Sequence, residues 1–253
     1  LHTAVIKFDP DGRVANPRLI AHLRSGAQCV KVDPSGNVLV ADNIMPVGVS
    51  YPRDFTDVLP DPLSRPYPAR MPDGSFDRLL RFMGSVFQFG PEGGTMVGLP
   101  EGTKAEPARR PDGDTWKPVP ETQWVMFHNH RLQVTGARWQ YHGISPIPAQ
   151  YQGVTHVERC VCRGARFDVD QLGRVFIPDS LRNRVTVLDS AGNLIGRFGE
   201  RDNQDSDGPH IGLMEPSWVC AAPDRVYVAD GAAGRIVKIR LESVSEATCT
   251  VTR

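Results

Sequence analysis

The chain lacks several features that would place it in a common functional class. It has no run of about 18 apolar residues, so we expect no membrane-spanning helix. Its 29 Lys and Arg residues equal its 29 Asp and Glu residues, and this zero balance argues against a broad nucleic-acid surface. It also lacks a Gly-x-Ser-x-Gly elbow, a P-loop and a dinucleotide fingerprint. We therefore predict no nucleic-acid partner and no support for those three reaction classes.

The termini and the cysteines add little of their own. The sequence begins at Leu1 without a basic, apolar signal segment, so we expect it to be a piece of a longer polypeptide with other domains. Five cysteines are an odd number and do not make a disulfide framework by themselves. We favour an extracytoplasmic location, periplasmic or at the cell surface.

What the chain does contain is a repeated hairpin. Alternating apolar residues run into an Asp/Gly or Glu/Gly turn, which is the sequence form of a β-hairpin. A second shared phrase precedes two of these hairpins, so that the whole repeat has four strands. The hairpin copies are VIKFDPDG (5–12), VFQFGPEG (86–93) and VTVLDSAG (185–192), and the second phrase is VDPSGNVLVADN (32–43), VDQLGRVFIPDS (169–180) and, shortened, APDRVYVADG (222–231).

Four short antiparallel strands in a repeat are typical of a β-propeller blade. In the clearest copy we predict strands at 165–169, 174–178, 184–188 and 193–198, and in the last copy at 217–221, 225–229, 235–241 and 247–252. We therefore predict an all-β, single-domain propeller over 1–253, incomplete at its N-terminus. Its units are a partial blade (1–19), a blade (20–98) with an insertion (43–84), a degenerate blade (123–155) and two blades at 160–200 and 213–253.

The segment RVFIPDSLRNRVTVLDSAGNLIGRFG (174–199) resembles an NHL repeat. The resemblance implies a TolB-like propeller, usually of six blades, and the region from Cys160 to Cys249 is similar to the C-terminal part of large bacterial NHL-containing proteins. Some NHL-type lyases hold a catalytic zinc with histidines from several blades. This chain has no histidine at a repeated strand position.

The long connections all fall between the second and third strands of a unit or between successive units. In a propeller those two kinds of connection lie on one face, which we call the long-loop face. Loops on a rigid scaffold carry binding groups, so we predict a binding domain that takes a protein, peptide or glycan partner on this face. The aromatic candidates for contact are Tyr51, Phe55, Tyr67 and Trp116.

The alternative is a lyase or hydrolase with a site at the channel mouth. Its candidate catalytic residues are Asp42, Asp179, His156 and His210. Asp179 precedes Arg184 by five residues, as Asp230 precedes Arg235, and we interpret these as structural pairs that brace a turn. Asp42 occupies the same position in its unit without a matching arginine.

No cofactor is predicted. The alternatives are a soft metal such as zinc at Cys160 and Cys162, whose one-residue gap is shorter than the usual two, and calcium at the acidic run from Asp202 to Asp207, which lacks EF-hand spacing. A disulfide or packing role for the cysteines and a solvated turn for the acidic run remain open beside them.

Overall fold

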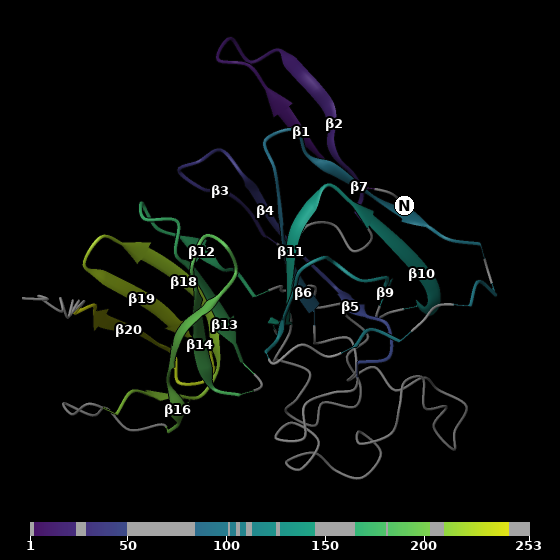
Figure 1. Ribbon diagram of the computed structural model, residues 1–253. Helices are drawn as coiled ribbons and strands as arrows, with labels where there is room; N and C mark the ends of the chain where they lie inside the picture. The colour runs from purple at the N-terminus through teal and green to yellow at the C-terminus, as the bar shows by residue number, and fades with distance from the viewer. Residues whose placement is uncertain are drawn as a thin grey trace, which may run out of the picture.

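The computed structural model is all-β, with strands gathered into curled sheets (Figure 1). It describes residues 3–23, 29–49, 84–100, 102–104, 107–109, 113–124, 127–144, 165–180, 182–202 and 210–242. Within these ranges there is no helix, and so none that is long and apolar enough to cross a membrane.

The two C-terminal sheets follow the predicted repeat. The four-stranded sheet consists of β12 (Asp168–Val169), β13 (Val175–Asp179), β14 (Arg184–Leu188) and β15 (Leu194–Phe198), in that order. The three-stranded sheet consists of β18 (Pro216–Ala222), β19 (Arg225–Asp230) and β20 (Arg235–Arg240). The strand predicted at 247–252 lies outside the described residues. A short parallel pair, β16 (Glu200–Arg201) and β17 (Gly212–Leu213), stands between these sheets in the chain.

The N-terminal half differs from the predicted blades. The central sheet has the order β3 (Cys29–Val32), β4 (Val38–Asp42), β6 (Gly84–Phe89), β11 (Ala137–Ile144) and β8 (Thr115–Trp116). The six-stranded sheet has the order β1 (Thr3–Phe8), β2 (Val14–Leu23), β7 (Gly94–Gly98), β10 (Phe127–Thr135), β9 (Thr122–Trp124) and β5 (Ile44–Pro46). Figure 1 shows the β1–β2 hairpin projecting from the other strands.

Two groupings expected from the sequence are therefore wrong. The prediction placed β6 and β7 in one blade and β9, β10 and β11 in a degenerate blade, whereas β6 pairs with β11 and β7 pairs with β10. The reason is the close approach of two turns, one at Gly93 and Gly94 and the other at Gly136. A Cβ on Gly136 would lie 2.5 Å from the Gly93 carbonyl oxygen, and one on Gly94 would overlap the Thr135 carbonyl oxygen. Only glycine permits this crossing, which sends the two arms of each hairpin into different sheets.

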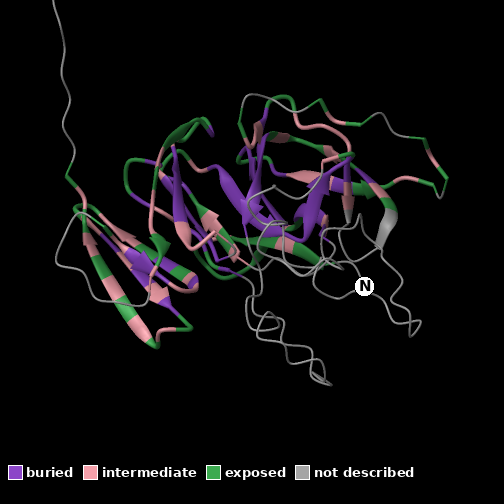
Figure 2. Cartoon of the chain, turned by 90° about the horizontal axis from the view of Figure 1, so that it is seen from below, coloured by how far each residue is buried: buried purple, intermediate pink, exposed green. Residues whose placement is uncertain are grey.

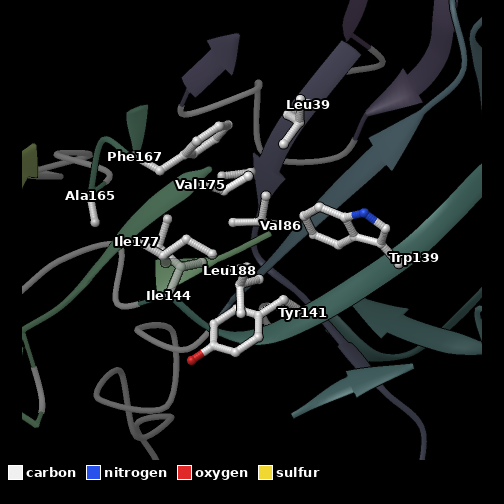
Figure 3. Close-up of a cluster of buried hydrophobic side chains, with 11 residues drawn as sticks. Leu39, Val86, Trp139, Tyr141, Ile144, Ala165, Phe167, Val175, Ile177 and Leu188 are labelled. Atoms are coloured by element: carbon white, nitrogen blue, oxygen red, sulfur yellow. The ribbon is translucent and has the colours of Figure 1, made fainter. Parts of the chain in front are cut away.

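Hydrophobic layers hold the successive sheets together. Strand β4 is buried on both faces: Val38 and Val40 pack toward the six-stranded sheet, while Leu39 and Ala41 face the four-stranded sheet. Figure 3 shows the second layer, in which Trp139 and Tyr141 of β11 meet residues of β13 and β14. A third layer joins the four-stranded to the three-stranded sheet. Buried residues accordingly concentrate in the strands whose sheet is packed on both sides, such as β4, β6 and β13 (Figure 2).

The repeated turn has one geometry at four places. An aspartate begins each turn, its backbone N–H donates to the carbonyl four residues later, and its Oδ1 accepts that residue's N–H. The glycine three residues after the aspartate has a φ between 77° and 80°, in the left-handed region that favours glycine. The four turns begin at Asp9, Asp33, Asp170 and Asp189. The hairpins predicted from the Asp/Gly pattern are thus confirmed as local structure.

Candidate functional site

Three aspartates end equivalent strands on the side from which the long connections leave. In the ladders, Asp179 lies opposite Arg184 and Asp230 lies opposite Arg235. Asp42 lies opposite Ser85. The insertion therefore returns to the sheet at the position where the other two units carry an arginine.

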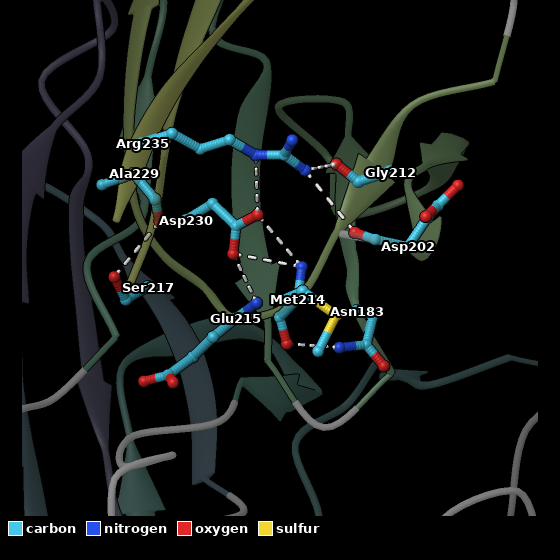
Figure 4. A network of polar contacts seen from close by, with 9 residues as sticks. All are labelled: Asn183, Asp202, Gly212, Met214, Glu215, Ser217, Ala229, Asp230 and Arg235. Carbon is cyan, nitrogen blue, oxygen red and sulfur yellow. Dashed lines mark hydrogen bonds and ion pairs between the residues drawn. The ribbon is translucent and has the colours of Figure 1, made fainter. Parts of the chain in front are cut away.

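Asp230 is the centre of a structural brace (Figure 4). It is 1 % exposed, and its carboxylate accepts the backbone N–H groups of Met214, at 3.1 Å, and Glu215, at 2.6 Å. Arg235 Nε lies 3.3 Å from Asp230 Oδ2, and Arg235 Nη2 donates to the Gly212 carbonyl at 2.9 Å. The charge of Asp230 is thus matched by three donors, which tie β19 and β20 to the preceding segment.

Asp179 pairs with the expected arginine, and a second arginine lies closer to it. Arg182 Nη1 lies 2.6 Å from Asp179 Oδ2, while Arg184 Nε lies 3.8 Å away. Burial lowers the pKa of Arg184, and the Asp179 charge opposes that effect. Sequence reasoning missed Arg182 because the corresponding turn of the three-stranded sheet, Gly231 to Gly234, carries no cation.

Asp42 belongs to a buried polar row at the end of the central sheet. The row consists of Asp42, Ser85, Gln140 and His142, all at most 3 % exposed. Ser85 Oγ donates to the Ile44 carbonyl at 2.6 Å, accepts from Gln140 Nε2 at 3.0 Å and lies 3.3 Å from His142 Nδ1. Ser85 and Gln140 were not anticipated, because a single polar residue within a strand does not reveal which other polar residues it will meet.

This row resembles a hydrolase constellation in composition but not in arrangement. A nucleophilic serine must reach the substrate and must pass its proton to a base. Ser85 is fully buried, and its proton is engaged by the Ile44 carbonyl oxygen. The row therefore fits a structural role, in which polar side chains hold β4, β6 and β11 together.

An exposed surface is formed where the first strands of three repeat units meet. β3, β12 and β18 each form the edge of a sheet, and β12 contacts both of the others. Next to β12, Arg166 bridges to β18: its N–H donates to the Ser217 carbonyl at 2.9 Å, and its carbonyl accepts the Val219 N–H at 3.0 Å. We name the surface made by Lys31, Arg166, Asp168 and Trp218 the inner-strand surface.

The side chains of the inner-strand surface carry an unbalanced positive charge. The Arg166 guanidinium lies over the Trp218 ring, 4.3 Å from its centroid, and Trp218 is 50 % exposed. Lys31 Nζ pairs with Asp168 at 2.8 Å, and that pairing raises the pKa of Lys31. Among the described residues no carboxylate is within ion-pair distance of Arg166. The surface thus combines an aromatic face with a guanidinium whose charge is not paired.

A thiol lies beside this surface without nucleophilic character. Burial raises the pKa of Cys29 to about 11, against the opposing charges of Lys31 and Arg166. A thiol with such a pKa stays protonated near neutral pH, and the thiolate is the reactive form. Cys29 and Cys220 are both free thiols.

The remaining predicted residues are not brought together. Trp116, expected on an exposed binding surface, is 5 % exposed in β8, because it lies beside Gln140 and packs its ring against His142. His210 is exposed and lies 3.1 Å from Glu200 Oε1. Within the described ranges no group of three metal-ligating side chains occurs. Tyr51, Phe55, Tyr67, His156, Cys160 and Cys162 lie outside those ranges, as does the acidic run after Asp202.

Comparisons with known proteins add one structural similarity. No family model matches the sequence, and no curated protein matches it. Among solved structures, the chain is similar to the selenomethionine-substituted virginiamycin B lyase from Staphylococcus aureus, with 10% identity and a TM-score of 0.23, over 87% of this chain and 71% of that one. At this level the similarity carries no conclusion about a reaction.

Proposed function

We propose that this chain is a binding domain of the NHL β-propeller type, and that its inner-strand surface takes an acidic peptide segment of a partner protein. The observation that carries the proposal is the exposed stack of Arg166 on Trp218. Tryptophan and arginine are the residue types most often responsible for binding energy at protein interfaces. Backbone hydrogen bonds from Arg166 to Ser217 and Val219 hold this exposed pair in place, so its position is already set when a partner binds.

The chemistry of the stack favours an anionic ligand. With one face of the guanidinium against the indole, the N–H groups along its edge remain able to donate to a carboxylate in a bidentate arrangement. The ring quadrupole also holds the guanidinium in place, which lowers the entropy cost of binding. Asp168 competes little with a ligand for the Arg166 guanidinium, because Asp168 is already bound by Lys31 and by the Ala221 N–H at 2.8 Å.

The neighbouring strand edge favours a peptide over a glycan. β3 pairs only with β4, so one of its edges carries no strand among the described residues. An extended peptide can add to such an edge through backbone hydrogen bonds. Exposed Val30 and Val32 on β3 would contact its side chains. Arg166 follows the 145–164 connection directly and lies toward the Asp179 end of the sheet, which fits the expected long-loop face.

The test is fluorescence anisotropy with a labelled hexaglutamate peptide, and with hexalysine for comparison. The wild-type chain should bind hexaglutamate and not hexalysine, and Trp218→Ala and Arg166→Met should each weaken binding about tenfold or more. Arg225→Ala is the matched control, since Arg225 is exposed and bonded to its neighbour Asp224. Equal losses in the control, or binding of polygalacturonate in place of the peptide, would contradict the proposal.

The rival function, a lyase or hydrolase at the channel mouth, makes a different demand. It needs accessible acid–base groups or a bound metal. Asp179 is bonded to Arg182, and Ser85 is buried, so neither of these groups supports it. Stoichiometric zinc, calcium or iron in the purified protein, measured by elemental analysis, would favour the enzyme over the binding domain.

A further inference from the structure

A second candidate site, the outer pocket, lies between the central and four-stranded sheets, beside their edge strands β8 and β15. An open pocket of about 310 Å³ separates the segment that contains β8 from the Asp189 turn and β15. Ligand pockets commonly span roughly 300–1,000 Å³, so this one has room for a small molecule only. None of the residues that form the inner-strand surface lines it.

Two side chains of the pocket lining are buried: Tyr141 is 1 % exposed and Leu188 is 0 % exposed. Tyr141 is further held by a hydrogen bond from its hydroxyl to Thr186 Oγ1 at 3.2 Å. Buried side chains beside a polar rim are common in small-molecule sites.

The rim carries more positive charge than it neutralises. Lys117 Nζ donates to Asn193 Oδ1 at 2.9 Å, and Asn193 also binds Asp189, whose pKa the Lys117 charge helps to lower. Among the described residues no carboxylate lies within ion-pair distance of Lys117, so two of its donors remain. Arg197 Nη2 lies 3.5 Å from Asp114 Oδ2, a loose contact that leaves most of the guanidinium donors available. Two cations and one carboxylate therefore line an open pocket.

From this arrangement we propose that the outer pocket binds a small anion-bearing molecule, a carboxylate or phosphate ester of about monosaccharide size. Lys117 and Arg197 bind the anionic group, and the exposed Leu194 of the lining contacts the body of the ligand. Asp114 opposes an anion by its charge and so sets the affinity. Lys117 directly follows β8 and Arg197 lies in β15, so a bound anion would connect the edges of two sheets.

The experiment is isothermal titration calorimetry on the whole chain at constant ionic strength, with inorganic phosphate, glucuronate and glucose as probes. Phosphate or glucuronate should bind and glucose should not. Arg197→Gln and Lys117→Met should each weaken the anion about tenfold or more. Arg240→Gln is the control, because Arg240 is an exposed cation of β20 paired loosely with Glu242 and lies outside the pocket.

A third variant tests the charge argument in the opposite direction. Asp114→Asn removes the competing carboxylate and should tighten anion binding severalfold, a gain that a damaged fold cannot imitate. The tighter of phosphate and glucuronate identifies the ligand as a phosphate or a carboxylate. Binding of glucose as tight as glucuronate, an equal loss in Arg240→Gln, or no heat with either anion would overturn the proposal.

Discussion

The three strand ends with a buried aspartate differ in what faces the carboxylate. In the two C-terminal sheets the residue across the ladder is an arginine, and the connection between the strands is a short turn. In the central sheet it is Ser85, and the chain makes a long excursion between Asp42 and its return at Gly84. One backbone position thus lies opposite an arginine in two sheets and opposite a serine in the third.

This difference shows how a repeat can be altered without losing its register. Where the arginine is present, it pairs with the carboxylate across the ladder. Where the turn is replaced by an insertion, Ser85 bonds to the Ile44 carbonyl and to Gln140 and lies beside His142. The polar row depends on β11, a strand more than fifty residues further along the chain.

The largest expected effect is on the brace itself. Asp230→Ala removes the acceptor of two backbone N–H groups and the partner of Arg235, so the free energy of unfolding should fall by about 3–5 kcal/mol. Urea unfolding followed by circular dichroism measures the loss. Asp224→Ala, which breaks an exposed pair with Arg225, should leave stability unchanged. Equal behaviour of the two variants would mean that Asp230 is not a brace.

A smaller effect is expected when the missing arginine is restored. Ser85→Arg places a guanidinium opposite Asp42, but the site is fully buried and already filled by bonded groups. We expect a loss of about 2 kcal/mol, because overpacking and a lost hydrogen bond outweigh the new charge pair. Ser85→Ala, which only removes the hydroxyl, should cost about 1 kcal/mol. If Ser85→Arg were instead stabilising, the three strand ends would be equivalent.

Stability should also depend on pH through Tyr141, whose hydroxyl lies near the Asp179 charge. Burial first, and then the Asp179 charge, raises the pKa of Tyr141 from 10.0 to about 12. The folded state therefore holds this proton more tightly than the unfolded state. Stability is unaffected below pH 10 and falls by about 1.4 kcal/mol per pH unit as the pH rises from 10 toward 12.

Guanidinium unfolding at several alkaline pH values measures this slope. Cys29, with a pKa of about 11, titrates in an overlapping range, so the comparison is made between Cys29→Ala and Cys29→Ala/Tyr141→Phe. Between pH 10 and 12 the free energy of unfolding should fall less steeply in Cys29→Ala/Tyr141→Phe than in Cys29→Ala. The tyrosinate absorbance of an Asp179→Asn variant should show a lower pKa for Tyr141. An unchanged pKa would mean that Asp179 carries no charge at this strand end.

Much of the fold was predictable from local patterns. The strands of the C-terminal sheets overlap their predicted ranges, and the turns that begin at Asp9, Asp33, Asp170 and Asp189 form at the Asp/Gly positions. Alternating apolar residues specify a strand, and a glycine with a left-handed φ specifies where the hairpin reverses. Both signals act over a few residues, so the sequence carries them directly.

The candidate sites were less predictable. Sequence reasoning paired Asp179 with Arg184 and placed Trp116 on an exposed surface, whereas Arg182 is the closer partner and Trp116 is buried. Both outcomes depend on side-chain packing, which no spacing reveals. The stack of Arg166 on Trp218 and the outer pocket join segments far apart in the chain.

The sequence by itself determined the strands of the two C-terminal sheets, the Asp/Gly turns and the aspartate that ends the second strand of three repeat units. Only the tertiary structure decided that β6 pairs with β11, that a serine faces Asp42 and that the Arg166 guanidinium covers an exposed indole. The physical reason is that strand formation follows from local alternation, while the choice of partner depends on which apolar faces pack and on where glycines let two backbones approach.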